Sequence, residues 1–220
     1  MNQFPGVIGR KLGMTQVFLG DGTVVPCTVV ESKAMVVGKR TQAKDGYDAL
    51  ILGLGERKEK HTSRPLAGQF AKAGVAPRRV LRELRCSPEW AAGFEVGQAI
   101  TLDRLFDVGQ LVDVRGVSRG RGFSGVMTRH HFKGGRMTHG NHEYRRHGGS
   151  IGTRMTPGRV KLGMKMPGQH GNATVSVLSQ EVVRVLPEEG LLLIRGGVPG
   201  PASGLVEVRG AVKRRGGKRA

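Results

Sequence analysis

Short apolar runs alternate with turn residues in the first hundred residues and in the last fifty. Residues 15–19 and 23–30 are rich in Val, Thr and Phe and flank Gly20-Asp21-Gly22. Asp-Gly between two such runs is a strong hairpin signal, because both turn positions tolerate positive φ. Pro26 has no amide hydrogen to donate, so we expect its strand at a sheet edge or a bulge.

The same alternation predicts further strands, at residues 35–39, 47–54, 98–102, 111–117, 173–178, 181–186, 191–195 and 205–209. A turn is expected at Lys44-Asp45-Gly46. Short strands at such close spacing are typical of a β barrel or sandwich, so the predicted fold class is mostly β.

Helical signals are few. Residues 65–73 predict a short helix, with Ser63 as the N-cap candidate and Gly74 as the terminator. A second helical turn is expected from Ser87-Pro88. Residues 56–64 form a charged run typical of a solvated loop. Residues 78–85 alternate like a strand but contain helix formers, and their four arginines fit contact with RNA and simple exposure to water equally well.

Residues 115–171 break this pattern, because no run in them has the period of a helix or a strand. They contain 12 Lys or Arg, 6 His, 14 Gly and a single acid, Glu143. Such a composition cannot bury an apolar face. We therefore expect a long, irregular, basic extension inserted between strands, which needs a polyanion to give it shape.

The charge divides the chain into four parts. Residues 1–114 carry 16 basic and 12 acidic side chains, and residues 172–208 carry 2 and 4. These near-neutral parts are expected to form one β body. The extension at 115–171 and a basic tail at 209–220 hold most of the net charge of +19.

A net charge of this size favours a neutralising partner. Nucleic acid is the leading candidate, because many Lys and Arg side chains release counterions together when they bind phosphates. A merely soluble basic protein and a DNA-compacting protein are the blander alternatives. Cys27 and Cys86 offer no disulfide framework, which favours a reducing compartment, and no signal peptide or membrane span is evident.

An enzyme is the alternative from another class. Gly120, Gly122 and Gly125 match the spacing GxGxxG, and a nucleotide-binding enzyme would use them as a phosphate loop. Such a site needs a following helix and an acid about 20 residues on, but position 145 is Arg. No other catalytic motif is present, so we expect no enzyme and no cofactor. The glycines instead let the backbone approach phosphates closely.

The six histidines of the extension raise the question of zinc. They are accompanied by no Cys, one Glu and many Arg, a poor set for a cation. We therefore expect no metal. Stacking on bases and hydrogen bonding to phosphates or 2′-hydroxyls fit this composition better.

Motifs spread over the chain carry a family resemblance. They are residues 8–15 (IGRKLGMT), 45–47 (DGY), 68–75 (GQFAKAGV), 112–114 (VDV), 118–123 (SRGRGF), 138–140 (THG), 149–152 (GSIG), 156–159 (TPGR) and 165–166 (KM). In this order they resemble bacterial-type large-subunit ribosomal protein number three, the L-three family.

The resemblance implies a translation-type β barrel that packs on ribosomal RNA. It also implies an extension that threads between RNA helices toward the peptidyl transferase centre, without catalysing peptide transfer. The expected role is that of a structural constituent and early assembly factor of the large subunit, in the cytoplasm. Its partners would be the 3′-terminal domain of the large-subunit rRNA, the peptidyl transferase region and neighbouring ribosomal proteins, with no membrane and no small-molecule substrate.

Charge and resemblance together predict RNA contacts at Arg10, Lys11, Arg115, Arg119, Arg121, Arg129, His130, His131, Lys133, Arg136, His139, His142, Arg145, Arg146, His147, Arg154, Arg159, Lys161, Lys165, His170, Lys213, Arg214 and Arg215. By family analogy, the residues nearest the peptidyl transferase centre are expected to be Gly152, Thr153, Arg154, Met155, Thr156 and Pro157.

The chain departs from the family pattern in three places. His130-His131-Phe132 stands where the family usually has Trp-Asn-Phe. Met155 occupies the position of a glutamine that is methylated in several bacterial members, so this modification is not expected. Leu162 and Met164 replace two common lysines and lower the local charge.

Overall fold

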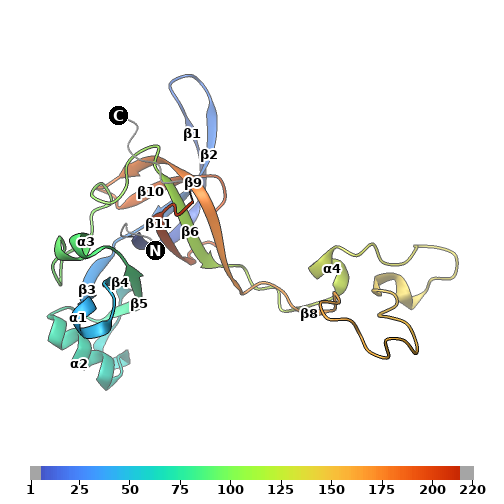
Figure 1. The fold of residues 1–220 in the computed structure, drawn as a ribbon. Helices are drawn as coiled ribbons and strands as arrows, with labels where there is room; N and C mark the ends of the chain where they lie inside the picture. Colours follow the sequence, from blue (N-terminus) through green and yellow to red (C-terminus); the bar gives the residue numbers. More distant parts are fainter. Residues whose placement is uncertain (1–5, 214–220) are drawn as a thin grey trace. The chain divides into compact units, whose positions relative to one another are not determined.

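Six antiparallel strands close into a barrel in the structure, a computed structural model that describes residues 6–213 (Figure 1). Around the barrel the strands follow the order β1 (Gly6–Phe18), β11 (Leu205–Gly210), β6 (Leu111–Val117), β9 (Thr174–Leu186), β10 (Leu191–Arg195) and β2 (Val24–Glu31). The prediction of a mostly-β fold with a barrel is confirmed. The chain divides into two units: residues up to Ser118 together with those from Thr174 onward, and Arg119–Ala173.

The hairpin of β1 and β2 forms where the Asp-Gly signal predicted it. The Thr23 amide donates to Asp21 Oδ1 at 2.9 Å, and this bond lowers the pKa of the Asp21 carboxyl. The expectation for Pro26 was wrong in part, because β2 pairs with a neighbour on both sides and is no edge strand. Pro26 is tolerated because its pairing with β10 stops at Arg195. Beyond that point, only the Gly196 amide donates a hydrogen bond to the Pro26 carbonyl, at 2.8 Å.

The segment between β2 and β6 forms a second, three-stranded sheet. It consists of β3 (Met35–Arg40), β4 (Ala49–Glu56) and β5 (Arg78–Arg85), so the ambiguous residues 78–85 are a strand. Four short helices accompany it: α1 (Gln42–Asp45), η1 (Glu59–His61), α2 (Arg64–Ala73) and α3 (Pro88–Ala92). The predicted helices near 65–73 and after Ser87 are thereby confirmed. The expected turn at 44–46 is the end of the short helix α1, which Gly46 terminates.

One strand prediction was wrong, and two other predicted strands are parts of a single longer strand. Residues 98–102 make only one isolated bridge, between Ala99 and Met35. Their apolar alternation reflects the burial of Ile100 and Leu102 in the core, not pairing in a sheet. The strands expected at 173–178 and 181–186 are one strand, β9, with an irregularity at Ser179. The irregularity arises because the Ser179 amide donates a hydrogen bond to Asp113 Oδ1 of the neighbouring strand β6, at 2.8 Å.

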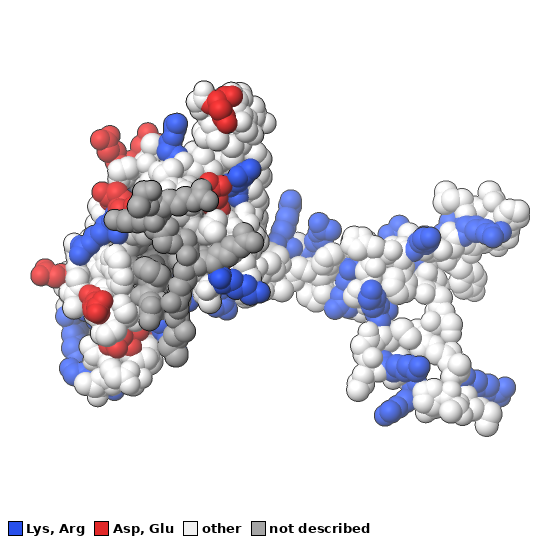
Figure 2. Space-filling view, turned by 45° about the horizontal axis from the view of Figure 1, so that its top comes forward, with Lys and Arg blue, Asp and Glu red and all other residues white. Residues whose placement is uncertain are grey.

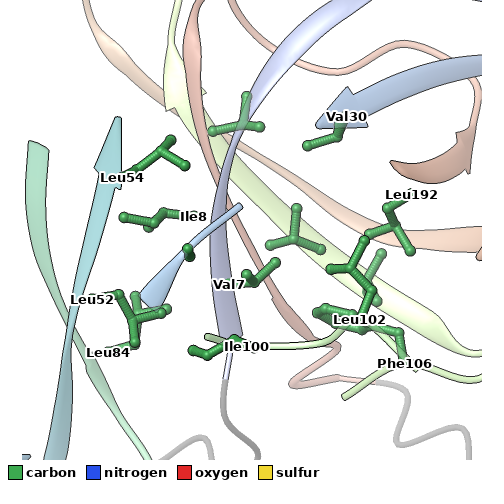
Figure 3. Packing of buried hydrophobic residues seen from close by; sticks show 14 of the residues in the cluster. Val7, Ile8, Val30, Leu52, Leu54, Leu84, Ile100, Leu102, Phe106 and Leu192 are labelled. Atoms are coloured by element: carbon green, nitrogen blue, oxygen red, sulfur yellow. The ribbon is translucent and has the colours of Figure 1, made fainter. Parts of the chain in front are cut away.

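The barrel and the three-stranded sheet share one hydrophobic core. Ile8 of β1 lies beside Leu52 and Leu54 of β4 and Leu84 of β5, as Figure 3 shows. On the barrel side, β2 and β10 bury further apolar side chains, among them Leu192. Burial on this scale stabilises the body by roughly 25 cal/mol for each Å² of apolar surface removed from water.

A polar cluster joins the strands of the three-stranded sheet on its exposed side. Glu83 accepts hydrogen bonds from the Tyr47 hydroxyl at 2.7 Å and from Arg40 Nε and Nη2 at 3.1 Å each. Arg40 also pairs with Asp45 at 2.8 Å, and the Arg85 guanidinium lies 4.5 Å from the centre of the Tyr47 ring. The hydrogen bond from Tyr47 and the charge of Arg40 hold the pKa of Glu83 below its usual range.

Candidate nucleic-acid interface

The basic extension leaves and re-enters the barrel at one place, because Val117 at the end of β6 pairs with Thr174 at the start of β9. A two-stranded ribbon follows directly. The Arg121 amide donates to His170 O and the His170 amide to Gly122 O, both at 2.9 Å. Then β7 (Phe123–Ser124) pairs antiparallel with β8 (Gly168–Gln169).

A one-turn helix, α4 (Val126–His130), packs against the returning chain. Arg129 Nη1 donates to Met166 O at 2.8 Å, and His130 Nε2 lies 3.1 Å from the same oxygen. Both residues were predicted RNA contacts. In this structure their polar atoms hold the extension together.

The next segment folds back on itself. The Gly135 amide donates to Arg145 O at 2.9 Å, and Asn141 Nδ2 donates to Arg136 O at 2.7 Å. This places η2 (Glu143–Arg146) near residues 133–136.

The fold of this segment creates a hollow of about 500 Å³ with aromatic walls. It is lined by Phe132, Tyr144 and His147, together with Lys133 and four glycines, which have no side chains to fill it. The rings of Tyr144 and His147 meet edge to face at 5.1 Å, and Tyr144 is 66% exposed. The sequence analysis did not predict that Phe132 and Tyr144 line a hollow. The sequence feature that could have indicated it is the presence of aromatic residues within a basic run.

Residues 150–165 contain no helix or strand and form one long loop of the extension, called the outer loop below. Its polar contacts are local: Ser150 Oγ donates to Gly152 O at 2.9 Å, and Thr153 Oγ1 bonds Thr156 O. Met155 is 83% exposed and Leu162 is fully exposed. All six residues expected nearest the peptidyl transferase centre, 152–157, are exposed.

Most of the predicted cations of the extension make no side-chain hydrogen bond or ion pair within residues 6–213. They are Arg119, Arg121, Lys133, Arg136, Arg146, Arg154, Arg159, Lys161 and Lys165, while Arg145 Nε makes one long bond of 3.4 Å to Asn141 O. Glu143, the single acid, pairs with none of them. On the face drawn in Figure 2, the unit 119–173 shows blue side chains without red ones, while both colours are interspersed over the body.

The histidines do not gather. His131, His139 and His142 are exposed, and the buried Nδ1 of the half-buried His170 has no hydrogen-bond partner among the described residues. No group of three or more His, Cys, Asp or Glu side chains in residues 6–213 has a metal-binding arrangement.

The glycine run 120–125 does not form a dinucleotide site. A helix does follow Gly125, but α4 spans only five residues. The strand before it, β7, pairs antiparallel with β8, whereas a dinucleotide fold needs a parallel βαβ unit.

No helix among the described residues is long and apolar enough to cross a membrane.

The remaining predicted contacts lie on the body or beyond it. Lys11 Nζ donates to Val198 O at 2.8 Å and Gly200 O at 3.2 Å, so its ammonium is occupied inside the barrel unit. Arg115 on β6 is exposed, and Arg10 is half-buried. Lys213 is exposed, and Arg214 and Arg215 lie outside the described residues.

Comparison with known proteins identifies the family. The model of the family "Ribosomal protein L3" matches residues 87–190. The large ribosomal subunit protein uL3 of Sorangium cellulosum is 59% identical over 218 residues, which are 99% of this chain and 94% of that protein. The uL3 proteins of Myxococcus xanthus and Acidothermus cellulolyticus are 50% and 49% identical, over 94% and 96% of this chain and 93% and 94% of their own lengths.

The chain belongs to the ribosomal protein L3 family. The resemblance inferred from its motifs is therefore confirmed, and so is the expectation that it is not an enzyme, since the family and these relatives are named as ribosomal proteins. Within this L3 chain, His130, which replaces the usual Trp, bonds the extension internally. Met155 and Leu162, two other departures, are exposed on the outer loop.

Proposed function

We propose that this L3 chain is a structural component of the large ribosomal subunit in the cytoplasm, and that its extension binds large-subunit rRNA. The observation that supports this is the row of unpaired Arg and Lys side chains along residues 119–165, opposed by one acid. Phosphates are the natural partners for guanidinium groups left unpaired by their own protein, because Arg binds phosphate oxygens with two parallel hydrogen bonds.

The aromatic hollow supports contact with bases as well. A nucleobase presents a flat π-face, and stacking on an aromatic side chain contributes about 1–3 kcal/mol in proteins that bind single-stranded nucleic acid. Tyr144 offers such a face, with Lys133 beside it for the adjoining phosphate. This combination fits irregular RNA, whose unstacked bases are accessible, better than a regular duplex.

The finer role follows from the family. We propose that the loop 152–157 approaches the peptidyl transferase centre, and that the chain joins the 3′-terminal domain of the rRNA early in assembly, beside other large-subunit proteins. The exposure of this loop and its purely local hydrogen bonds leave its surface free for RNA. Arg154 is its cationic member.

Cosedimentation with large ribosomal subunits tests the proposal. The chain should remain with the subunit through a high-salt wash, because contacts along the whole extension must break together. A variant without residues 119–173 should be released at lower salt. Release of both at the same salt concentration, or equal affinity for duplex DNA and rRNA, would contradict the proposal.

The free protein offers a second test. We expect the extension to be mobile without RNA, since its outer loop has few contacts, and limited proteolysis should cut within 131–166 first. Resistance equal to that of the barrel would refute this expectation.

A further inference from the structure

The methionines of this chain are concentrated in the extension. Five of the seven within residues 6–213 lie between positions 127 and 166. Three of these five are exposed: Met155 at 83%, Met137 at 73% and Met164 at 38%. An apolar side chain that stays in water adds little to the stability of the fold, so the protein itself gives these thioethers no structural use.

The other two methionines of the extension do have a structural use. A Cβ built on Gly134 would lie 3.1 Å from Met127 Sδ, so this thioether packs directly on bare backbone. The Met166 carbonyl accepts a hydrogen bond from Arg129 Nη1 and lies 3.1 Å from His130 Nε2. Both methionines are half-buried. One extension thus contains covered and open sulfur atoms.

Met155 is held in place by its backbone, while its side chain points into solvent. The bond between Thr153 Oγ1 and Thr156 O closes the turn around it, and a Cβ built on Gly158 would lie 3.1 Å from Met155 O. The Met155 side chain belongs to none of the hydrophobic clusters found within residues 6–213. Its sulfur is therefore open to small solutes.

An open thioether reacts with a hydroperoxide without the help of a catalytic group. A sulfur lone pair attacks the hydroxyl oxygen of the peroxide, so that an S–O bond forms and the O–O bond breaks. The sulfur loses two electrons and the peroxide gains them. The proton of the transferred hydroxyl passes to the departing oxygen, which leaves as water or as an alcohol. The product, methionine sulfoxide, is polar, and methionine sulfoxide reductases convert it back to the thioether.

We propose that Met155 is a site of reversible oxidation by hydroperoxides in the chain before assembly, with Met137 as a second site. The reactivity follows from the exposure of the two side chains. Protection after assembly rests on the proposed function, because RNA packed on residues 152–157 would shield the Met155 sulfur. Met14 on β1, which is 58% exposed, should react as well.

Peptide mass spectrometry after mild treatment of the full chain with hydrogen peroxide tests the proposal, because trypsin places each methionine on a peptide of its own. The informative peptides are 155–159 for Met155, 137–145 for Met137, 122–129 for Met127 and 34–39 for Met35.

In the native free chain, Met155 should gain oxygen faster than Met35, which packs against a buried cluster of the body, by about tenfold or more. In urea, which unfolds the chain, the two rates should become equal. The reductases should then restore the original peptide masses. Equal rates for Met155 and Met35 in the native free chain would overturn this inference and leave the proposed function standing.

Purified large subunits separate the two proposals. If RNA covers the outer loop, Met155 should react much more slowly there than in the free chain. If Met155 reacts equally fast in both, the oxidation site stands and the proposed approach of residues 152–157 to RNA is wrong.

The consequence for RNA binding is measured with Met155→Leu as the matched control. A sulfoxide removes apolar surface that the thioether offers to sugars and bases. The oxidised wild type should therefore bind a large-subunit rRNA transcript about fourfold more weakly than its reduced form, the factor that corresponds to the apolar contact of one methylene group. In the oxidised variant, Met14 and Met137 are modified in the same way, and the loss should be smaller. Equal losses in both proteins would overturn the effect assigned to Met155.

Discussion

Lys11 separates a structural role from an RNA-binding one, and replacing it by Met tests which holds. The substitution keeps most of the apolar stem and removes the ammonium, which donates to Val198 O at 2.8 Å and Gly200 O at 3.2 Å. Hydrogen bonds to charged groups contribute about 1.5–3 kcal/mol each. Since the second bond is long and the side chain is half-buried, we expect a total loss of about 2–3 kcal/mol.

Thermal unfolding measures this loss. For a chain of this size, 1 kcal/mol corresponds to roughly 2–4 °C, so Lys11→Met should lower Tm by about 4–12 °C. Lys33→Met is the control, because Lys33 is 71% exposed and its ion pair with Glu31 belongs to a class worth at most about 1 kcal/mol. The salt slope of rRNA binding should not change in either variant.

The opposite pattern would refute this assignment. If Lys11→Met leaves Tm within a degree or so of the wild type but lowers the salt slope by roughly 0.7–0.9, Lys11 binds a phosphate and the two carbonyl contacts do not matter.

Three further predictions concern other parts of the chain. Gly171→Ala places a Cβ in collision with Arg119 O, so hydrogen exchange at the Arg121 and His170 amides should quicken by about tenfold or more, whereas Gly163→Ala, with open space around it, should not have this effect. Tyr144→Leu should weaken rRNA binding by about 1 kcal/mol or more in a filter-binding assay, and Tyr144→Phe should not, since it keeps the stacking ring. Tyr47→Phe should lower Tm at neutral pH. Because the folded-state pKa of Glu83 is depressed, this difference should shrink as pH falls below about 4.3, and a difference that persists in acid would contradict the role of the Tyr47–Glu83 bond.

Local chemistry made part of the fold predictable. The turn at Asp21-Gly22 depends on residues within it, and so does the helix that starts near Ser63 and ends at Gly74. Charge was equally informative, because the basic extension and the neutral body differ in composition alone.

Partners distant in sequence decided the rest. Two separate strands were expected on either side of residues 179–180, but the chain continues as β9, with an irregularity at Ser179, whose amide donates to Asp113 on the neighbouring strand. Residues 78–85 became a strand because β4 pairs with them. In the same way, Lys11 and Arg129 found carbonyl partners that no charge count could indicate.

The central claim is that the extension contacts large-subunit rRNA directly. Ultraviolet cross-linking of purified large subunits that contain this chain, followed by mass spectrometry of its tryptic peptides, tests it. We predict nucleotide adducts on peptides from residues 119–173, foremost on the peptide 137–145, which carries Tyr144. Adducts confined to the barrel and the three-stranded sheet, with none in the extension, would contradict the account.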